Sequence, residues 1–432
     1  MSNRKTFIRA AMLLPLALTF AHAETITLDQ ALIRALESDE RIEIQRREVS
    51  IAEREVDRAW TIISPRLMAA GRYDRPESEV RQDDRVLIPE DSWSATITAT
   101  QPLFDGRVLP ARRLGIALER AEAETLVHDI RLSLFDVSQI YFGVLSSAEQ
   151  VELAKQTVAL STQEVARAKA RFDAGEARRT ELLRAEVDEA RARRNLVAAV
   201  NAYDVARADL ARRLGLDADY EFEVEAPAPM AEPESEVLRE LFLQALDQRN
   251  DLIAARLQID SASEQRDVIR REAWPTLELQ YNHSFVDPES TNRRNNWWEI
   301  AAVARYEFWD GGSRRISRLQ QDDRITQAEL QVADLEKSIQ LEVQQALLEL
   351  LNVREDLIAL RKEVALAEEN YRTLSEQARV GLATSLDVST ALNELDFART
   401  ELARQEYQFE IAKLRVELAT GQFASDYIEV NE

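Results

Sequence analysis

The chain has 432 residues, no cysteine and a formal net charge of −23. An acidic excess of this size argues against nucleic acid and anionic lipid headgroups as partners, because both would be repelled. Without disulfides, the fold must be stabilised by packing or by oligomerisation.

The first 23 residues have the pattern of a targeting signal. A basic start precedes an apolar stretch over residues 10–20, and Ala21-His22-Ala23 fits the small-x-small cleavage pattern. We therefore expect residues 1–23 to be a signal peptide and the mature chain to leave the cytoplasm.

The rest of the chain is duplicated. Gly175 is followed by Gly215 after forty residues, and Gly381 is followed by Gly421 after the same interval. The segment Leu103-Phe104-Asp105-Gly106 also returns, as Phe308-Trp309-Asp310-Gly311. A long-period repeat of this kind indicates two copies of one structural unit, neither of which can bury its apolar face alone.

The first copy, over residues 24–216, opens with a predicted helix at about 28–62. Thr27 or Asp29 can cap this helix, and Pro65 ends it.

Two extended stretches follow at about 66–76 and 91–103, which together predict a β-hairpin over about 66–103. From Ser92 the second stretch alternates small polar and apolar residues. Its length is close to the ~9–11 residues of a tilted membrane strand. The acidic charge therefore does not argue against a membrane protein of this kind.

A helical hairpin is predicted over about 110–214, with a very long first helix. Gly175 marks its turn, because glycine adopts the left-handed conformation that ends many helices. Thr180 can cap the returning helix.

Residues 217–235 are rich in proline and acidic residues and read as a linker. The second copy, over 236–424, repeats the order with a β-hairpin at about 276–309 and a helical hairpin at about 313–420. Its turn contains Gly381, and Thr384 or Ser385 can cap its returning helix. Residues 425–432 form a tail of similar kind to the linker.

The long helix of the second copy carries the strongest periodicity. Its apolar positions between Val343 and Ala378 are separated by three and four residues in strict alternation, which is a coiled-coil seam. Tyr371 lies on this seam and is expected in the core. Helices of this length must run side by side as a tube or a rod.

Aromatic residues gather at the ends of the predicted strands. They match the girdles at the two interfaces of a membrane barrel, although ordinary packing at the edge of a core would look similar. The candidate interface residues are Trp93, Phe104, Trp297, Trp298, Phe308 and Trp309.

Little in the sequence indicates catalysis. His128 and His283 stand apart, without acid–base spacing around them, and no nucleotide-binding, zinc or nucleophile motif is present. We therefore expect neither an enzyme nor a cofactor or metal site.

The chain resembles the TolC family of outer-membrane efflux proteins over its whole mature length. No single motif is specific, and the order, spacing and duplication carry the resemblance. The motifs are Ile26-Thr27-Leu28-Asp29-Gln30-Ala31-Leu32, Pro65-Arg66-Leu67, Gln101-Pro102-Leu103-Phe104-Asp105-Gly106, Arg171-Phe172-Asp173-Ala174-Gly175-Glu176, Pro275-Thr276-Leu277 and Arg379-Val380-Gly381-Leu382-Ala383-Thr384.

The resemblance implies a mainly α-helical fold with a small β-barrel contribution. Each protomer of a homotrimer would give four strands to one twelve-stranded barrel in the outer membrane, continuous with an α-helical barrel in the periplasm. Four strands alone cannot close a barrel, which agrees with this expectation.

The resemblance also implies that the helical turns form the periplasmic tip, where an adaptor docks. The tip residues are Gly175, Glu176, Val380, Gly381 and Leu382.

In the best-studied member of the family that this chain resembles, two acid rings, one turn apart on the returning helix of the second copy, close the tip. The first aligns with Asp387, but the second aligns with Thr390, and an arginine that ties the closed tip aligns with Ala383. Asp387 and Thr390 are the candidate pore constriction. Asp387 can equally serve as an acid in the first turn that stabilises the helix dipole by ~0.3–1 kcal/mol.

The predicted function is therefore a passive exit duct of a tripartite efflux pump or a type I secretion system. Its partners would be a periplasmic adaptor, outer-membrane lipid and an inner-membrane transporter of the resistance–nodulation–division, ABC or major facilitator type. The alternative is a periplasmic coiled-coil structural or adaptor protein that never enters the membrane.

Overall fold

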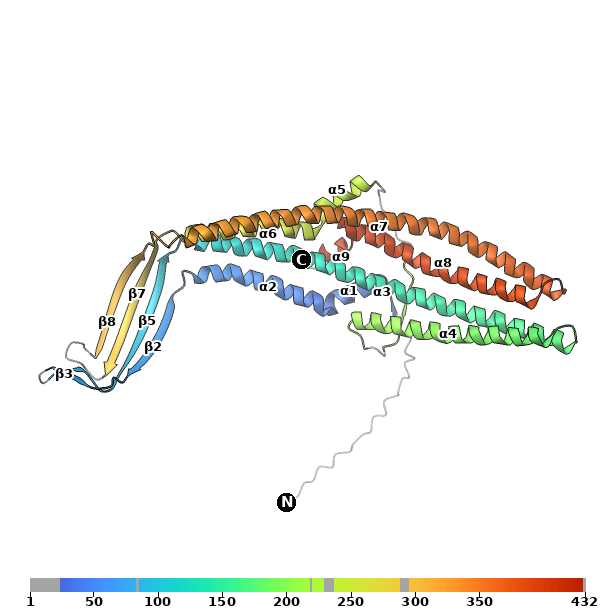
Figure 1. Cartoon of the computed structure of the whole chain (residues 1–432), viewed down its shortest axis with the longest axis horizontal. Coiled ribbons are helices and arrows are strands. Elements are labelled where there is room, and N and C mark those ends of the chain that lie inside the picture. Colours follow the sequence, from blue (N-terminus) through green and yellow to red (C-terminus); the bar gives the residue numbers. More distant parts are fainter. Residues whose placement is uncertain (1–23, 83–84, 218–219, 229–236, 288–294, 430–432) are drawn as a thin grey trace, which may run out of the picture.

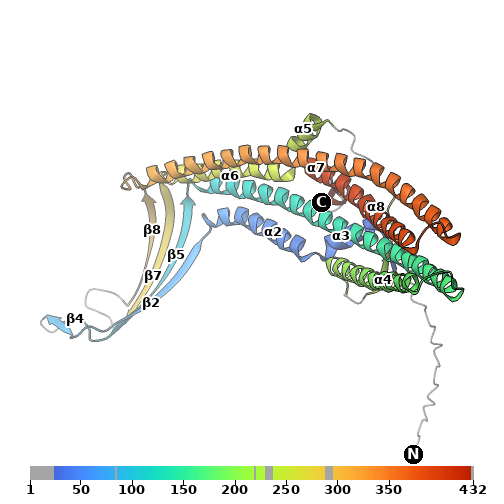
Figure 2. The ribbon, with the colours of Figure 1, turned by 45° about the vertical axis from the view of Figure 1, so that its right-hand side comes forward.

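The computed structural model describes residues 24–82, 85–217, 220–228, 237–287 and 295–429. The chain is elongated, with a β-sheet at one end and two helical hairpins that turn at the other end (Figure 1). Figure 2 shows that the sheet is set at an angle to the helices. In the described part of the chain, no helix has both the length and the apolar character to cross a membrane.

The predicted duplication is confirmed, because the two copies have the same element order. The first copy contains α1 (Leu28–Ser38), α2 (Glu40–Thr61), β2 (Arg66–Asp74), β5 (Ser92–Phe104), α3 (Val108–Asp173) and α4 (Arg179–Arg213). The second contains α5 (Leu238–Gln248), α6 (Asn250–Arg271), β7 (Thr276–Asp287), β8 (Asn296–Arg305), α7 (Ser313–Arg379) and α8 (Ser385–Thr420).

The single helix expected over 28–62 is wrong, because the helix breaks at Asp39. This residue is extended (φ −75°, ψ 113°), and its carboxylate accepts the backbone N–H of Arg41 at 2.9 Å, which starts α2. Thr27 caps α1, together with Gln30. The second copy breaks at the same place, at Arg249 (φ −76°, ψ 119°).

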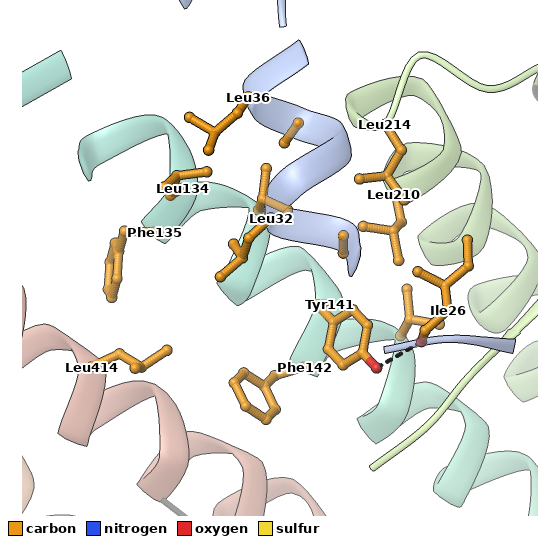
Figure 3. Packing of buried hydrophobic residues seen from close by; sticks show 14 of the residues in the cluster. Ile26, Leu32, Leu36, Leu134, Phe135, Tyr141, Phe142, Leu210, Leu214 and Leu414 are labelled. Atoms are coloured by element: carbon orange, nitrogen blue, oxygen red, sulfur yellow. Dashed lines mark hydrogen bonds between the residues drawn. The ribbon is translucent and has the colours of Figure 1, made fainter. Parts of the chain in front are cut away.

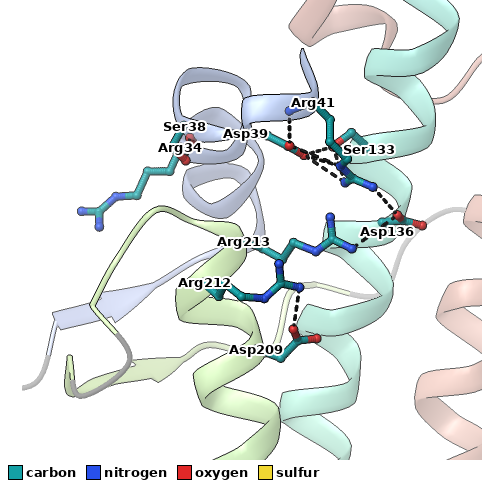
Figure 4. Close-up of polar contacts among 9 residues, drawn as sticks. All are labelled: Arg34, Ser38, Asp39, Arg41, Ser133, Asp136, Asp209, Arg212 and Arg213. Atoms are coloured by element: carbon teal, nitrogen blue, oxygen red, sulfur yellow. Dashed lines mark hydrogen bonds and ion pairs between the residues drawn. The ribbon is translucent and has the colours of Figure 1, made fainter. Parts of the chain in front are cut away.

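A helical break of this kind is stabilised by contacts that are distant in sequence. The hydroxyl of Ser133, on α3, donates to Asp39, and Arg41 bonds both Asp39 and Asp136 (Figure 4). Asp39 is only 8 % exposed. Burial alone would raise the pKa of its carboxyl, but the hydrogen bonds from Arg41 and Ser133 outweigh this and lower the pKa to about 2.

Short elements complete the fold. The parallel strands β1 (Glu24–Ile26) and β6 (Phe222–Val224) join the start of the chain to the segment between the copies. The loop of the first β-hairpin contains two further strands that we did not predict, β3 (Val80–Gln82) and β4 (Arg85–Ile88). The tail begins with α9 (Ser425–Glu429), where we expected no helix.

The largest buried cluster lies midway along the helices and is centred on Tyr141 of α3. Its hydroxyl donates to the carbonyl oxygens of Ile26 (2.9 Å) and Glu225 (2.6 Å), so that the α3 core is tied to the β1–β6 pair (Figure 3). Phe142 and Leu414 connect the same cluster to α8.

The second cluster contains the start of the predicted coiled-coil seam. Val343, Ala346 and Leu350 of α7 are buried against α5 and α8, and the seam residues from there to Ala378 are buried or half-buried. Tyr371 is half-buried, as part of this row. The long helices therefore pack pairwise, α3 with α4 and α7 with α8, as Figure 1 shows.

Candidate functional sites: the helical turns and the two faces of the sheet

Both helical hairpins turn through a glycine in the left-handed conformation. Gly175 has φ +76° and Gly381 has φ +79°. In the first turn the N–H of Glu176 donates to the carbonyl of Arg171 (2.9 Å), and in the second the N–H of Leu382 donates to that of Gln377 (2.9 Å). These bonds satisfy carbonyls that the helix end leaves free, so each turn is tight and ordered.

The two turns differ in the side chains that they expose. At the second turn, Val380 is 64 % and Leu382 is 79 % exposed. At the first, the exposed residue after the glycine is the charged Glu176. The end of the molecule thus carries an unburied apolar pair on one hairpin and charge on the other.

The returning helices start in two different ways. In α8, Thr384 is the N-cap: its hydroxyl accepts the N–H of Asp387 (3.3 Å), and Asp387 accepts the N–H of Thr384 (2.8 Å). In α4 the N-cap is Arg178, whose N–H donates to Glu181 at 3.5 Å, so the prediction that Thr180 caps this helix is wrong. The acid in the third helical position makes the reciprocal bond in both copies, which leaves Thr180 inside the first turn.

Asp387 and Thr390 lie together on the exposed side of α8. Val388, between them in sequence, points the other way and is only 3 % exposed. The hydrogen bonds from the hydroxyl and the N–H of Thr384 lower the pKa of the Asp387 carboxyl. The capping role of Asp387 is therefore present in the structure, and its carboxylate is ionised and open to solvent.

Polar contacts join the two hairpins just behind the turns. Arg167 donates to the hydroxyl of Ser375 (2.8 Å), the hydroxyl of Tyr371 donates to Glu164 (3.3 Å), and Ser389 donates to Asp188. Between these contacts lies a cavity of about 280 Å³, lined by residues of α3, α4, α7 and α8. The two helical hairpins are thus held together by hydrogen bonds near the turns and by apolar packing farther from them.

At the opposite end, the four long strands form one antiparallel sheet in the order β2-β5-β7-β8. Residues that pair across neighbouring strands point to the same face, which divides the sheet in two. One face is mainly apolar and includes Leu67, Ala69, Trp93, Ala95, Ile97, Ala99, Leu279, Tyr281, Phe285, Trp298, Ile300 and Ala302. The other is mainly polar and includes Arg72, Ser94, Thr96, Thr98, Thr100, Gln280, Asn282, Ser284, Glu299 and Arg305.

The predicted interface aromatics lie at the two ends of this sheet. Trp93 (49 % exposed) and Trp298 (63 %) are at the end far from the helices. Phe104, Phe308 and Trp309 are at the end near the helices, and the last two follow β8.

A bulge sets the direction of Phe104. The register shifts between Pro102 and Phe104, so that Phe104 pairs with Leu277 and joins the apolar face. Trp297 differs from Trp93, Trp298 and Phe104, because it pairs with Ser284 on the polar face. We therefore leave Trp297 out of the interface set.

Sequence reasoning missed other aromatics at the same two levels. Tyr73 pairs with Trp93 at the far end, and Trp274 stacks on Phe104 near the helices, with ring centroids 6.4 Å apart. Period-two alternation through β2 could have identified Tyr73, since Leu67, Ala69 and Gly71 precede it on the same face.

Comparison with known families agrees with this architecture. The model of the outer membrane efflux protein family matches residues 31–216 and 241–422, which are the two copies. The chain belongs to this family.

The alignments with named members of the family extend over nearly the whole chain. The outer membrane efflux protein BepC of Brucella suis is 24 % identical over 98 % of this chain and 92 % of its own length. The alkaline protease secretion protein AprF of Pseudomonas aeruginosa is also 24 % identical, over 90 % and 82 %. The CmeC outer membrane channel of Campylobacter jejuni has the same fold, with a TM-score of 0.75, 13 % identity, and 99 % and 97 % coverage.

As an outer membrane efflux protein, the chain is a TolC-type efflux or secretion channel of the outer membrane with a periplasmic helical part. It is a transport protein and not an enzyme. The alternative of a periplasmic coiled-coil protein that never enters the membrane is thereby set aside.

Proposed function

We propose that this channel works as a homotrimer in which each protomer gives four strands to one closed, twelve-stranded sheet. The single chain leaves β2 and β8 at the two open edges of its sheet. Unpaired backbone groups at such edges cost several kcal/mol each in lipid, and four strands cannot close on themselves. Neighbouring copies satisfy both edges.

The apolar face of this sheet faces outer-membrane lipid, between two levels of aromatic residues. Trp93 and Trp298 mark one level, and Phe104, Phe308 and Trp309 mark the other. At ~3.4 Å per residue and a tilt of ~45°, the stretch from Trp93 to Phe104 spans ~26 Å along the membrane normal. This agrees with the ~25 Å height of the apolar band of such barrels.

The helical turns are the docking end for a periplasmic adaptor. What supports this role is the exposed apolar pair Val380 and Leu382, at the end of the molecule farthest from the sheet. An apolar patch on an otherwise polar surface is typical of a site that binds protein. Gly175 and Gly381 keep these turns tight, and Glu176 adds charge beside them.

The adaptor connects the channel to an inner-membrane transporter, of the resistance–nodulation–division, ABC or major facilitator type. The transporter supplies the energy, and the channel conducts passively. BepC is named as an efflux protein and AprF as an alkaline protease secretion protein, so these names support a duct for efflux and a duct for protein secretion alike.

Asp387 and Thr390 line the constriction at the tip. Three copies of the Asp387 carboxylate around one axis would form a narrow ring that attracts cations. Its hydrogen bonds with Thr384 orient the carboxylate, so the capping and constriction roles are compatible.

The docking role is tested by complementing a deletion strain. Leu382→Asp and Val380→Asp should abolish export, read as drug susceptibility and as secreted protein, while the amount of trimer in the outer membrane stays normal. Leu243→Asp on α5, at a position 56 % exposed, is the matched control and should export normally. Full export by both turn variants would show that the turns do not dock the partner.

A further inference from the structure

The two copies correspond residue by residue up to the start of the strands. Helices α1 and α2 and strand β2 begin 210 residues before α5, α6 and β7 (Leu28 and Leu238, Glu40 and Asn250, Arg66 and Thr276). After the β-hairpin loop, α3 and α7 begin 205 residues apart, at Val108 and Ser313. Each residue of β2 thus has a counterpart in β7, and each residue of β5 has one in β8.

The strand registers obey the same correspondence. Arg66 pairs with Thr100 in the first hairpin, and their counterparts Thr276 and Arg305 pair in the second. Leu67 with Ala99 and Leu277 with Ala304 agree in the same way. The two hairpins are therefore superimposable down to single hydrogen-bonded residue pairs.

Between the copies lies a second kind of junction, which pairs β5 with β7. In it Thr96 pairs with Ser284, Ile97 with His283 and Ala99 with Tyr281. In a closed ring of copies, the next junction of this kind must join β8 of one chain to β2 of another, because these are the counterparts of β5 and β7. The internal junction thus serves as a template for the junction between molecules.

We propose that β8 pairs antiparallel with β2 of the neighbouring copy in the register that the β5–β7 pair dictates. Ala302 then lies opposite Tyr73, and Ala304 lies opposite Gly71, both on the apolar face. On the polar face the template places Ala301 opposite Asp74, Val303 opposite Arg72 and Arg305 opposite Ala70.

The division of the sheet into an apolar and a polar face was not used to derive this register, and it agrees with it. Tyr73 shares the apolar face with Trp93, and Ala302 shares it with Leu279. A slip by one residue would place Ala302 against Arg72 and turn this arginine towards lipid, where a charged side chain is disfavoured.

The helices below the sheet give independent support. Ser261 of α6, inside the chain, is 9 % exposed, whereas its counterpart Ile51 of α2 is 52 % exposed. Leu114 of α3 is half-buried, whereas its counterpart Leu319 of α7 is 54 % exposed. The open edges thus expose large apolar side chains at positions that are covered at the internal junction. A second copy would cover them in the same way.

Cysteine pairing tests the register directly, since the chain has no cysteine of its own. Four double variants of the full chain are needed: Tyr73→Cys with Ala302→Cys, Gly71→Cys with Ala304→Cys, and the two crossed combinations. Gly71 tolerates a side chain, because the nearest atom to an added Cβ is 4.0 Å away.

Directly opposed residues have Cα atoms ~4.5–5.5 Å apart, within the range of a disulfide. In the crossed pairs a two-residue offset adds ~7 Å along the strand and prevents the bond. Within one chain the two cysteines are three strand spacings apart, about 14 Å, so only a bond between copies can form.

After oxidation in membranes, the two matched variants should form covalent trimers on a non-reducing gel, at least ten times more than the crossed variants. Bonds in the crossed variants but not in the matched ones would overturn the register. No bond in any variant, with a trimer still present by native mass, would overturn the strand pairing. Because the inference rests on the proposed trimer, native mass is measured first, and a monomer there would refute the trimer itself.

Discussion

The buried carboxylate at the break between α1 and α2 gives a stability prediction that can be worked from the structure. Asp39→Asn keeps an oxygen that can cap α2 but removes the charge that bonds Arg41 and Ser133 (Figure 4). The pKa of Asp39 is lowered from 3.8 to about 2. At ~1.4 kcal/mol per pKa unit, the ionised form contributes roughly 2 kcal/mol to folding at neutral pH.

The sign of the pH dependence follows from the lowered pKa. The contribution of Asp39 is complete above its unfolded pKa and is lost as the pH falls through the folded value. The cost of Asp39→Asn should therefore be roughly 2 kcal/mol at pH 7 and roughly half of that at pH 3.

The assay is urea unfolding of the detergent-extracted protein, followed by the helical circular dichroism signal. Asp209→Asn is the control, because Asp209 forms an exposed pair with Arg212 on α4 (3.0 Å) and should cost less than ~1 kcal/mol. If Asp39→Asn costs no more than this control, or costs the same at pH 3 as at pH 7, the assignment of a buried, ionised Asp39 is refuted.

Three further predictions concern the constriction, a buried arginine and the helix ends. Asp387→Asn retains an oxygen for the helix cap. It should weaken block by trivalent cations in planar bilayers by about tenfold or more, because the ring loses its three negative charges; unchanged block would leave Asp387 with the capping role only. Arg249 is 7 % exposed and bonds Asp251 and Glu342, both at 2.7 Å, so Arg249→Ala should cost ~3–5 kcal/mol in urea unfolding. Arg256 is the control, because its pair with Glu336 (3.1 Å) is exposed and should contribute less than ~1 kcal/mol. Equal costs for Arg256→Ala and Arg249→Ala would contradict this account. Gly421→Ala places a Cβ 2.8 Å from a backbone oxygen at φ +81°, whereas Gly175→Ala has the same left-handed strain and no neighbour within 4 Å. The first should lower the melting temperature clearly more than the second, whose cost is ~1–2 kcal/mol; equal shifts would mean that the contact at Gly421 relaxes freely.

Features with a local cause could be predicted from the sequence. Gly175 and Gly381 end their helices in the left-handed conformation because only glycine adopts it without strain. The seam from Val343 onwards is readable because its spacing repeats over many turns. Because the sequence is duplicated, the β-hairpin and the helical hairpin expected in one copy could also be expected in the other.

Features that depend on distant contacts could not be predicted in this way. The apolar pattern of the first helix runs past Asp39, and the break depends on Ser133 and Asp136, almost a hundred residues away. Trp297 and Trp298 are neighbours in sequence, and only the pairing register shows that they lie on opposite faces.

Both copies have an acid at the third position of the returning helix, Glu181 and Asp387. The threonine that caps α8 has its counterpart in Arg178 of α4, so the more obvious Thr180 misled the prediction.

The central claim is that this outer-membrane channel is built from three copies that close one sheet. The most direct test is the native mass of the protein extracted from the outer membrane in mild detergent, with the contribution of bound detergent subtracted. The account predicts three times the mass of the mature chain, with both helical and strand signals in circular dichroism. A monomer or a dimer in the same extract would contradict it.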